Sequence, residues 1–313
     1  MKKILIVTDG KAGHENQSKA LCRGLGYDFD TWRVSYASPL KKAWAYAADN
    51  LGILSYAPFL ADPLPQGPYA AVICTGSTAF YPGKVYARKH GIPVAAILYP
   101  KGYRLDFDCI LAPIFDRPKK QPNVIPVPVN LTAPDQSFYD AGTQAFLAKH
   151  TPKKPAVGVI IGGPNPFATL TAEQMRRELD RLFEKTEGME RWVTTSRRTP
   201  SEVDALIDRY PFDYQLIYSR DHFNPIPAFV SLCERLFVTA DSTGMISEAV
   251  TCGPARVEVL MNLSGENSKF ARFIRHLESE QAIHVFDGTL GTAAKKVDLK
   301  PIFEQASALL FHR

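Results

Sequence analysis

Short apolar runs alternate with amphipathic stretches along almost the whole chain. Such runs, each ended by a polar turn, are typical of buried parallel strands, whereas the stretches between them repeat apolar residues at helical spacing. The predicted strands are Lys3–Thr8, Phe29–Val34, Ala70–Cys74, Val94–Leu98, Asp108–Ala112, Ala156–Ile161, Trp192–Thr195, Tyr214–Tyr218, Leu236–Val238 and Arg256–Leu260. Strands that alternate with helices predict an α/β fold built on parallel sheets.

A proline-rich segment divides this alternation into two halves. Prolines recur between residues 113 and 136, which indicates an extended connection. The strand–helix pattern then starts again at Ala156. A chain of 313 residues is also long for a single hydrophobic core. We therefore predict two Rossmann-like domains, residues 1–150 and 151–313, whose parallel sheets face each other across a cleft.

The most informative turn follows a strand of the second half. Asp241 and Ser242 are residue types that begin helices, Thr243 comes next, and Gly244 leaves room for a phosphate. A helix that begins at the carboxyl end of a parallel strand offers free N–H groups and a positive dipole end to an anion. Glu248, about one turn further on, could accept hydrogen bonds from ribose hydroxyls. The alternative is an ordinary capped helix of an α/β domain.

Two more polar loops follow strands of the same half. One carries paired arginines, whose guanidinium fork suits a diphosphate or a carboxylate, and the other carries paired glycines. The candidate donor-binding residues in these loops are Ser196, Arg197, Arg198, Gly162, Gly163 and Asn165. The alternative is that the arginines lie on the surface of a turn without a ligand.

The first strand ends in a dense polar loop, which supplies the candidates for a general base. Asp9, His14 and Glu15 lie between this strand and the next predicted helix. The loop contains glycine and lysine but matches neither the dinucleotide fingerprint nor a Walker loop. A structural role for His14 at the start of a helix is the alternative.

The positive charge lies in the first half. Residues 1–150 carry 17 Lys+Arg against 11 Asp+Glu, and the remaining 20 and 21 complete the totals of 37 and 32. A basic face beside the aromatic stretch Lys41–Tyr46 suits an anionic membrane surface or a lipid-linked acceptor. The alternatives are a solvated surface and aromatic side chains that belong to the core. Nucleic acid is not indicated, because no dense Lys/Arg block occurs.

Composition also indicates the compartment. Five scattered cysteines, with no Cys-x-x-Cys pair, are typical of a reducing compartment and give no zinc motif. The apolar run after Met1 is too short for a signal peptide, and no run is long enough to span a membrane. We therefore expect a cytoplasmic protein, peripheral to the inner face of the membrane if it binds lipid. Asp106 and Asp108 have the spacing of a metal motif but lead into a buried strand, so no metal site is predicted.

Three motifs resemble the signatures of the mitochondrial-fission Elm-type family. They are Asp-Gly-Lys-x-Gly-His-Glu-Asn-Gln-Ser at residues 9–18, Thr-Thr-Ser-Arg-Arg-Thr-Pro at residues 194–200, and Thr-Ala-Asp-Ser-x-x-Met-x-Ser-Glu-Ala at residues 239–249. They occur in the family's order, and the resemblance spans essentially the whole chain. Bacterial members of this family are regarded as glycosyltransferases of the GT-B fold.

The resemblance implies a metal-independent sugar transferase without a separate cofactor. A nucleotide-sugar donor would bind mainly to the second domain, and an acceptor, such as one of the cell envelope, would bind to the first. Two other functions remain open: a nucleotide-sugar epimerase of the same fold, and a non-catalytic adaptor related to the mitochondrial-fission factor.

Overall fold

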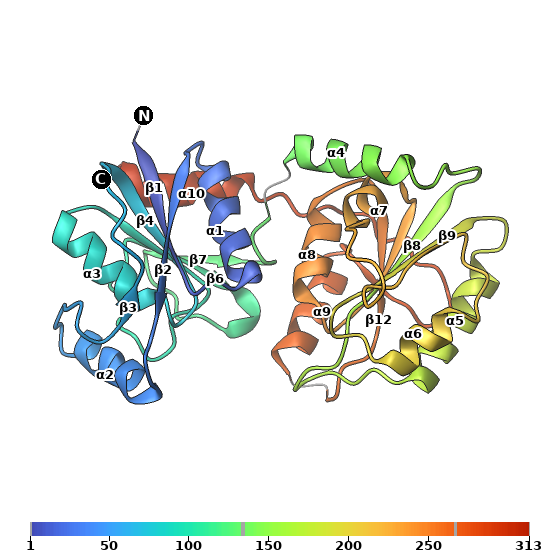
Figure 1. Ribbon diagram of the computed structural model, residues 1–313, viewed down its shortest axis with the longest axis horizontal. Coiled ribbons are helices and arrows are strands. Elements are labelled where there is room, and N and C mark those ends of the chain that lie inside the picture. The colour runs from blue at the N-terminus through green and yellow to red at the C-terminus, as the bar shows by residue number, and fades with distance from the viewer. Residues whose placement is uncertain (1, 133–134, 266–267, 313) are drawn as a thin grey trace. The chain divides into compact units, whose positions relative to one another are not determined.

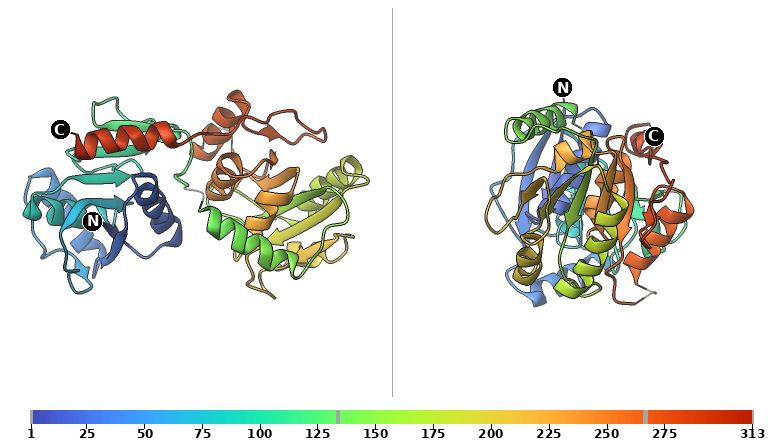
Figure 2. Two further views of the ribbon diagram at one scale, coloured as in Figure 1. Left: turned by 90° about the horizontal axis from the view of Figure 1, so that it is seen from above. Right: turned by 90° about the vertical axis from the view of Figure 1, so that its right-hand side faces the viewer.

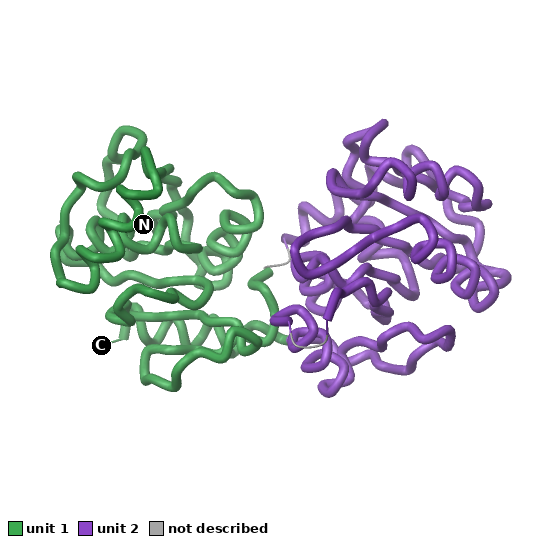
Figure 3. The backbone as a smooth tube through the Cα atoms, turned by 90° about the horizontal axis from the view of Figure 1, so that it is seen from below, with its two compact units in different colours: residues 1–133, 298–313 green, residues 134–297 purple. Residues whose placement is uncertain are grey.

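The chain folds into two compact units. The computed structural model describes residues 2–132, 135–265 and 268–312. One unit comprises residues 1–133 and 298–313, and the other comprises residues 134–297 (Figure 3). Each unit is a sheet covered by helices on both faces (Figure 1). The predicted α/β fold with two parallel-sheet, Rossmann-like domains is therefore confirmed.

The first unit is built on a seven-stranded sheet of order β3-β2-β1-β4-β5-β6-β7. Only the short edge strand β3 runs antiparallel to its neighbour. Its elements are β1 (Lys3–Thr8), α1 (Ala12–Gly24), β2 (Phe29–Ser35), α2 (Pro39–Asn50), β3 (Leu60–Ala61), β4 (Tyr69–Thr75), α3 (Phe80–His90), β5 (Val94–Ile97), β6 (Cys109–Pro113), the 3₁₀ turn η1 (Ile114–Asp116), β7 (Val124–Val127) and α10 (Lys300–Phe311). Central strand β1 is buried from Ile4 to Thr8, as a strand covered on both faces must be.

The second unit is built on a six-stranded sheet of order β10-β9-β8-β11-β12-β13, and all its strand pairs are parallel. Its elements are α4 (Gln136–Leu147), β8 (Ala156–Ile161), α5 (Ala172–Lys185), β9 (Glu190–Thr195), α6 (Ser201–Ile207), β10 (Tyr214–Leu216), α7 (Ile226–Leu232), β11 (Arg235–Thr239), α8 (Thr243–Thr251), β12 (Arg256–Leu260), α9 (Lys269–Ser279) and β13 (His284–Val285). Helix α5 begins with the predicted capping box of Thr171 and Gln174.

The order of the second sheet reverses between β8 and β11. The chain moves from β8 outward to β9 and β10, and from β11 in the opposite direction to β12 and β13. Because crossovers between parallel strands are right-handed, α5 and α6 cover one face, whereas α8 and α9 cover the other (Figure 1). The helices that follow β8 and β11 thus lie on opposite faces of the sheet at this switch point, the position at which open α/β sheets usually bind ligands.

The units differ from the predicted division at residue 150 in two places. Helix α4 belongs to the second unit, where it packs on α7. Helix α10 belongs to the first unit and lies beside β6 and β7 (Figure 2). Within the proline-rich segment, Val124–Val127 forms edge strand β7, which tolerates Pro126 because only one side needs a pairing partner. In the described residues, no helix is long and apolar enough to cross a membrane.

Candidate functional site

Two glycines hold the loops at the switch point in close contact. Gly162 and Gly163 follow β8, and their N–H groups donate to Thr239 Oγ1 over 2.8 Å and to Asp241 Oδ2 over 3.0 Å. A Cβ atom on Gly162 would collide with the Asp241 carboxylate, and one on Gly163 would collide with the backbone of Arg198. The paired glycines therefore let three loops approach one another, which no larger residue would allow.

Asp241 accepts hydrogen bonds from several loops at the carboxyl edge of the second sheet. Its side chain is fully buried. Oδ2 accepts from Gly163 and, over 2.8 Å, from Arg198 Nη2, whereas Oδ1 accepts from Asn262 Nδ2 over 3.3 Å. Asn165 Nδ2 donates to the Asp241 carbonyl over 3.2 Å. A buried carboxylate needs such donors, and these come from the loops that follow β8, β9 and β12.

The two predicted phosphate-binding arginines have different environments. Arg198 donates from Nη1 to the carbonyls of Gly163 and Pro164 over 3.0 and 3.2 Å, in addition to its ion pair with Asp241. Arg197 is exposed, and its side chain makes no hydrogen bond or ion pair within the described part of the chain. Arg198 thus supports the loop, whereas the guanidinium of Arg197 has no such role within the described residues.

The loop after β9 is fixed by Thr199. The hydroxyl of Thr199 accepts from the N–H of Ser196 over 2.9 Å and donates to the carbonyl of Gly162 over 2.5 Å. Ser196 Oγ accepts in turn from the N–H of Arg198 over 3.2 Å. Pro200 occupies the N-cap of α6, and the Thr199 side chain instead joins two sheet-edge loops.

The first turn of α8 is open. Ser242 occupies the N-cap, as predicted, but its side chain makes no capping hydrogen bond to the helix. Asp241, the other predicted cap, is engaged with the loops described above. Gly244 is exposed, and a Cβ atom there would meet no atom within 4 Å. At Gly244 this turn presents a backbone N–H group and the positive end of the helix dipole to an anion.

Glu248 lies against α4. Its Oε1 accepts a hydrogen bond of 2.6 Å from the hydroxyl of Tyr139. Burial raises the pKa of the Glu248 carboxyl, and the hydrogen bond from Tyr139 lowers it only in part. One oxygen of the predicted ribose acceptor is therefore already occupied by a protein group. Tyr139 could not be inferred from the sequence, because α4 was not recognised there.

The first unit has a histidine–carboxylate pair at the carboxyl end of β1. His14 Nδ1 lies 3.0 Å from Asp9 Oδ1, and Lys11 Nζ lies 3.0 Å from the other carboxylate oxygen. Burial opposes ionisation of Asp9, but the hydrogen bond from Lys11 and the charge of His14 together hold its pKa below the usual range. Within the described residues, His14 Nε2 has no hydrogen-bond partner. A carboxylate at Nδ1 leaves the opposite nitrogen as the base.

The remaining base candidate, Glu15, is paired differently. Its Oε2 lies 3.4 Å from Lys19 Nζ, and its Oε1 accepts from Thr8 Oγ1 over 3.5 Å. The imidazole of His14 packs against Gly76, where any side chain would collide with the ring. The loop after β4 thus orients His14, and the geometry favours His14 over Glu15 as the base.

Three further residues belong to the second unit's edge and were absent from the predicted site: Thr239, Asn262 and Tyr139. Thr239 and Asn262 lie at the carboxyl ends of β11 and β12, and a polar residue at the end of a buried strand is the signal that could have identified them. No three His, Cys, Asp or Glu side chains group closely enough to hold a metal ion in the described ranges.

A protein-family model described as "Mitochondrial fission ELM1" matches residues 12–311, nearly the whole chain. No curated protein matches. The motifs that suggested this family in the sequence are the loops after β1, β9 and β11.

Solved structures of similar fold have very different sequences. A UDP-GlcNAc 2-epimerase from Methanocaldococcus jannaschii has 13% identity and a TM-score of 0.52, with 100% of each chain covered. Arabidopsis thaliana UGT89C1, complexed with UDP-L-rhamnose, has 11% identity and a TM-score of 0.52 over 98% of this chain and 94% of that one. The S. aureus MnaA–UDP co-structure has 13% identity and a TM-score of 0.50, covering 99% and 97%. At such identities the likeness shows the GT-B-like fold alone.

Proposed function

The chain belongs to the mitochondrial fission ELM1 family, and we propose that it transfers a sugar from a nucleotide-sugar donor to an acceptor hydroxyl. The observation that carries this proposal is the open first turn of α8, which lies at a topological switch point next to a loop with one uncommitted arginine. Helix N-H groups and a guanidinium are suited to a diphosphate, and they stabilise its charge as it departs without requiring a metal ion.

The donor would bind to the second unit. Its diphosphate would meet the hydroxyl of Ser242, the N–H group of Gly244 and the guanidinium of Arg197, whereas the N–H of Ser242 already donates to the carbonyl of Thr239 over 3.4 Å. The Asp241 network would keep these loops in place. Glu248 would accept from a ribose hydroxyl through the oxygen that Tyr139 leaves available. These assignments rest on the local geometry of the second unit.

The acceptor would react at the first unit. The acceptor oxygen would bond to the anomeric carbon, while the bond from that carbon to the diphosphate breaks and the diphosphate leaves with the electron pair. The acceptor's proton would pass to His14 Nε2. Asp9, at 3.0 Å from Nδ1, would hold the ring in the required tautomer and stabilise the imidazolium.

A panel of UDP-, GDP-, ADP-, dTDP- and CMP-sugars tests this proposal. Binding at 100 times the dissociation constant stabilises a protein by about 2.7 kcal/mol, which a thermal shift detects. Turnover of the bound donor that depends on an added acceptor supports a transferase, and turnover to an isomeric sugar without acceptor supports the alternative epimerase. A panel without any shift supports the adaptor and contradicts the proposed function.

We also propose that α2 binds an anionic membrane surface, from which a lipid-linked acceptor could be reached. Leu40 and Trp44 of α2 share one face with Leu51 at its C-cap, because they are spaced by four and seven residues, and the three are 82%, 43% and 75% exposed. Exposed Lys41 flanks this stripe, and Arg104 Nη1 lies against Gly52 at its end. An apolar stripe beside cations is the pattern of a surface that enters lipid headgroups.

The aromatic residues of α2 and of the segment after it lie in two environments, the surface and the core. Trp44 is exposed, but Phe59 is buried and Tyr46 stacks on Tyr103 with ring centroids 4.0 Å apart. Tyr56 packs against the core and lies under Lys89 Nζ, 4.1 Å from its ring centroid. The surface proposed for lipid therefore consists of the outer face of α2, and most of the aromatic residues after it belong to the core.

A further inference from the structure

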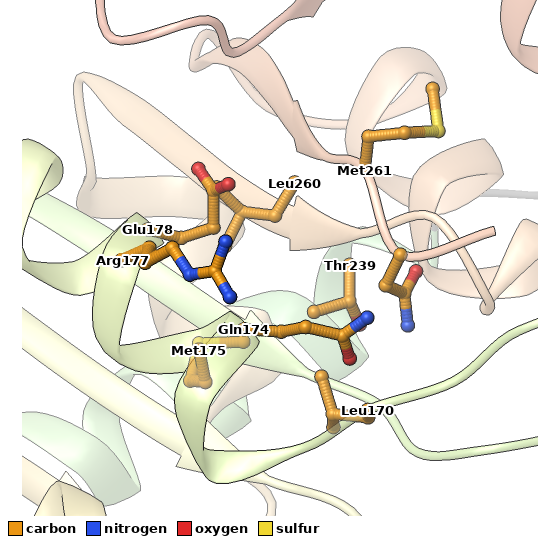
Figure 4. Close-up of a pocket in the computed structure, with 9 residues that line it drawn as sticks. Leu170, Gln174, Met175, Arg177, Glu178, Thr239, Leu260 and Met261 are labelled. Carbon is orange, nitrogen blue, oxygen red and sulfur yellow. The ribbon is translucent and has the colours of Figure 1, made fainter.

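A pocket opens at the carboxyl edge of the second sheet, on the face covered by α5. It lies between α5 and the ends of β11 and β12 (Figure 4). Its lining residues are Leu170, Gln174, Met175, Arg177, Glu178, Thr239, Leu260, Met261 and Asn262. Apolar side chains and a small number of polar groups thus share the walls, as is usual for a site that binds a small molecule.

Two acceptors in this lining have no hydrogen-bond donor from the described residues. They are Asn262 Oδ1 and Glu178 Oε2, and both atoms are buried. Asn262 is only 7% exposed as a residue. A buried acceptor without a donor is unfavourable, so each of these two oxygens leaves a position in the pocket for a donor from a ligand.

The orientation of the Asn262 amide is fixed by its other contact. Asp241 Oδ1 lies 3.3 Å from Nδ2, and a carboxylate that already accepts from Arg198 and Gly163 requires the amide's donor on that side. Exchanging the two ends of the amide would place oxygen against oxygen. Asn262 Oδ1 is therefore the atom that the pocket presents as an acceptor.

Glu178 adds a second acceptor whose charge is poorly solvated. Burial raises the pKa of its carboxyl, which the charges of Arg181 and Arg177 offset only in part. A ligand N–H at Oε2 would stabilise the ionised form. The pocket thus favours a ligand that presents hydrogen-bond donors to these two oxygens over a ligand that presents carbonyl oxygens.

Two residues of the pocket lining also hydrogen-bond to the proposed diphosphate loops. Thr239 lines the pocket and accepts from the N–H of Gly162, and Asn262 lines it and donates to Asp241. A group seated in the pocket would therefore lie next to the residues that hold Asp241, which directly precedes the first turn of α8.

We propose that this pocket binds the nucleobase of the donor, and that it selects a base with an amino group. This inference rests on the proposed function. Adenine, guanine and cytosine each present an exocyclic amino group, whereas uracil and thymine present carbonyl oxygens beside a single ring N–H. Asn262 Oδ1 and Glu178 Oε2 would accept from the amino group and from a neighbouring N–H where the base has one. Leu170, Met175 and Leu260 would contact the faces of the ring.

Titration calorimetry with GDP, IDP, ADP, CDP, UDP and pyrophosphate tests the inference. At least one amino-bearing nucleotide should bind about tenfold or more tightly than UDP, which corresponds to one additional hydrogen bond. If guanine is the base, IDP, which lacks only the 2-amino group, should lose a similar factor. UDP binding as tightly as every amino-bearing nucleotide would overturn the inference and leave the proposed function intact, whereas loss of all binding, pyrophosphate included, would overturn both.

Glu178→Gln separates base recognition from diphosphate binding. The amide loses the negative charge and one of the two acceptor oxygens and gains an NH₂ donor, so the preference for the amino-bearing nucleotide over UDP should fall by about tenfold, with pyrophosphate affinity unchanged. Glu184→Gln, an exposed carboxylate on the same helix, is the matched control and should bind every ligand as the parent does. An unchanged preference in Glu178→Gln, with the fold intact, would show that the pocket does not contact the base.

Discussion

Arg198 Nη2 donates to the fully buried Oδ2 of Asp241 over 2.8 Å, and this contact gives the two adjacent arginines different roles. A pair of arginines after a strand predicts a bidentate clamp for a diphosphate. In the folded chain, Arg198 instead satisfies a carboxylate and two carbonyls of its own loops. Arg197 alone keeps a guanidinium that no described side chain engages.

Replacing each arginine by alanine should therefore have a different effect. Arg197→Ala should weaken the binding of a nucleoside diphosphate and of pyrophosphate by about ten- to a hundredfold, the value of one charge-assisted hydrogen bond, with the stability unchanged. Arg198→Ala should lower the free energy of unfolding by about 2 kcal/mol, because a buried carboxylate loses a donor. Calorimetry and urea denaturation measure the two quantities.

Lysine at position 197 provides the control. Arg197→Lys should recover part of the affinity, because a point charge replaces the fork incompletely. If the two alanine variants weakened affinity equally, and Arg198→Ala lost no stability, both arginines would be assigned to the diphosphate, as the sequence suggested.

The histidine–carboxylate pair predicts a large catalytic effect. His14→Gln should reduce kcat for sugar transfer by about 10²–10⁴-fold, since a positioned general base contributes that factor. Asp9→Asn should also reduce kcat, because its amide could donate to Nδ1 and stabilise the wrong tautomer. Donor affinity should be unchanged in both variants. Transfer at the parent rate by His14→Gln would exclude His14 as the base, with Glu15→Gln as the comparison.

The sequence identified most elements of the fold from periodicity alone. Buried strands such as Lys3–Thr8 and Ala156–Ile161 consist of apolar runs, and the structure confirms both with the predicted bounds. Strands β3 and β13 have two residues each, which is too short for any pattern to reveal. Strand β7 was concealed by Pro126, because proline signals a connection more often than an edge strand.

The division into units could not be predicted correctly, because helix α10 is distant in sequence from the sheet that it covers. Phe311 stacks on Tyr27 with ring centroids 5.1 Å apart, and Phe303 fills the space above Gly24. Apolar residues recur at helical spacing between residues 299 and 311, but this periodicity does not indicate which of two similar sheets receives the apolar face. That choice depends on the complementary surface, here the absence of a side chain at Gly24.

Leu310 tests the assignment of α10. It is 4% exposed, and Leu310→Ala should cost about 2–5 kcal/mol of stability. The loss should appear as faster amide hydrogen exchange in β1 and β6, with β8 and β11 unaffected. Half-buried Leu309→Ala is the control and should have a smaller effect on the same strands. Faster exchange in β8 in place of β1 would assign the helix to the second unit.

The outer face of α2 predicts salt-sensitive binding to lipid. The parent protein should cosediment with vesicles that contain anionic phosphatidylserine at low salt and should dissociate at high salt, because exposed charge pairs are screened. Leu40→Ser combined with Trp44→Ser should remove most of the binding. Phe138→Ser, an apolar residue 50% exposed on α4, should leave it unchanged. Binding that persists in the double variant would place the contact elsewhere.

The candidate site shows which functional features a sequence can reveal. Loops after strands were identified because polar residues end each apolar run, and this located Asp241 and Gly162 at one edge. The partners of each group depend on the folded loops, however, so the structure alone assigns Arg198 to Asp241 and Tyr139 to Glu248. Asn262 was overlooked as a ligand residue because a single asparagine after a strand carries no spacing signal.

Glu248 offers a test that separates stability from function. Burial raises the pKa of its carboxyl above the ordinary value of about 4.5. In the pH window between the ordinary pKa and the raised pKa, the folded chain therefore still holds a proton that the unfolded chain has lost. The free energy of unfolding therefore falls as pH rises through the window, and the cost of the ionised group is fully present above it. Glutamine would still accept from Tyr139 but would not ionise.

Glu248→Gln should therefore be as stable as the parent at a pH below about 4 and more stable at neutral pH, as measured by urea denaturation across that range. If the carboxylate accepts a hydrogen bond from the ribose, the same variant should bind nucleoside diphosphates more weakly and pyrophosphate equally well. Tyr139→Phe is the control, because it removes the hydroxyl but keeps the carboxylate for ribose. A variant that gains stability and keeps full nucleotide affinity would show that Glu248 serves only the packing of α8 on α4.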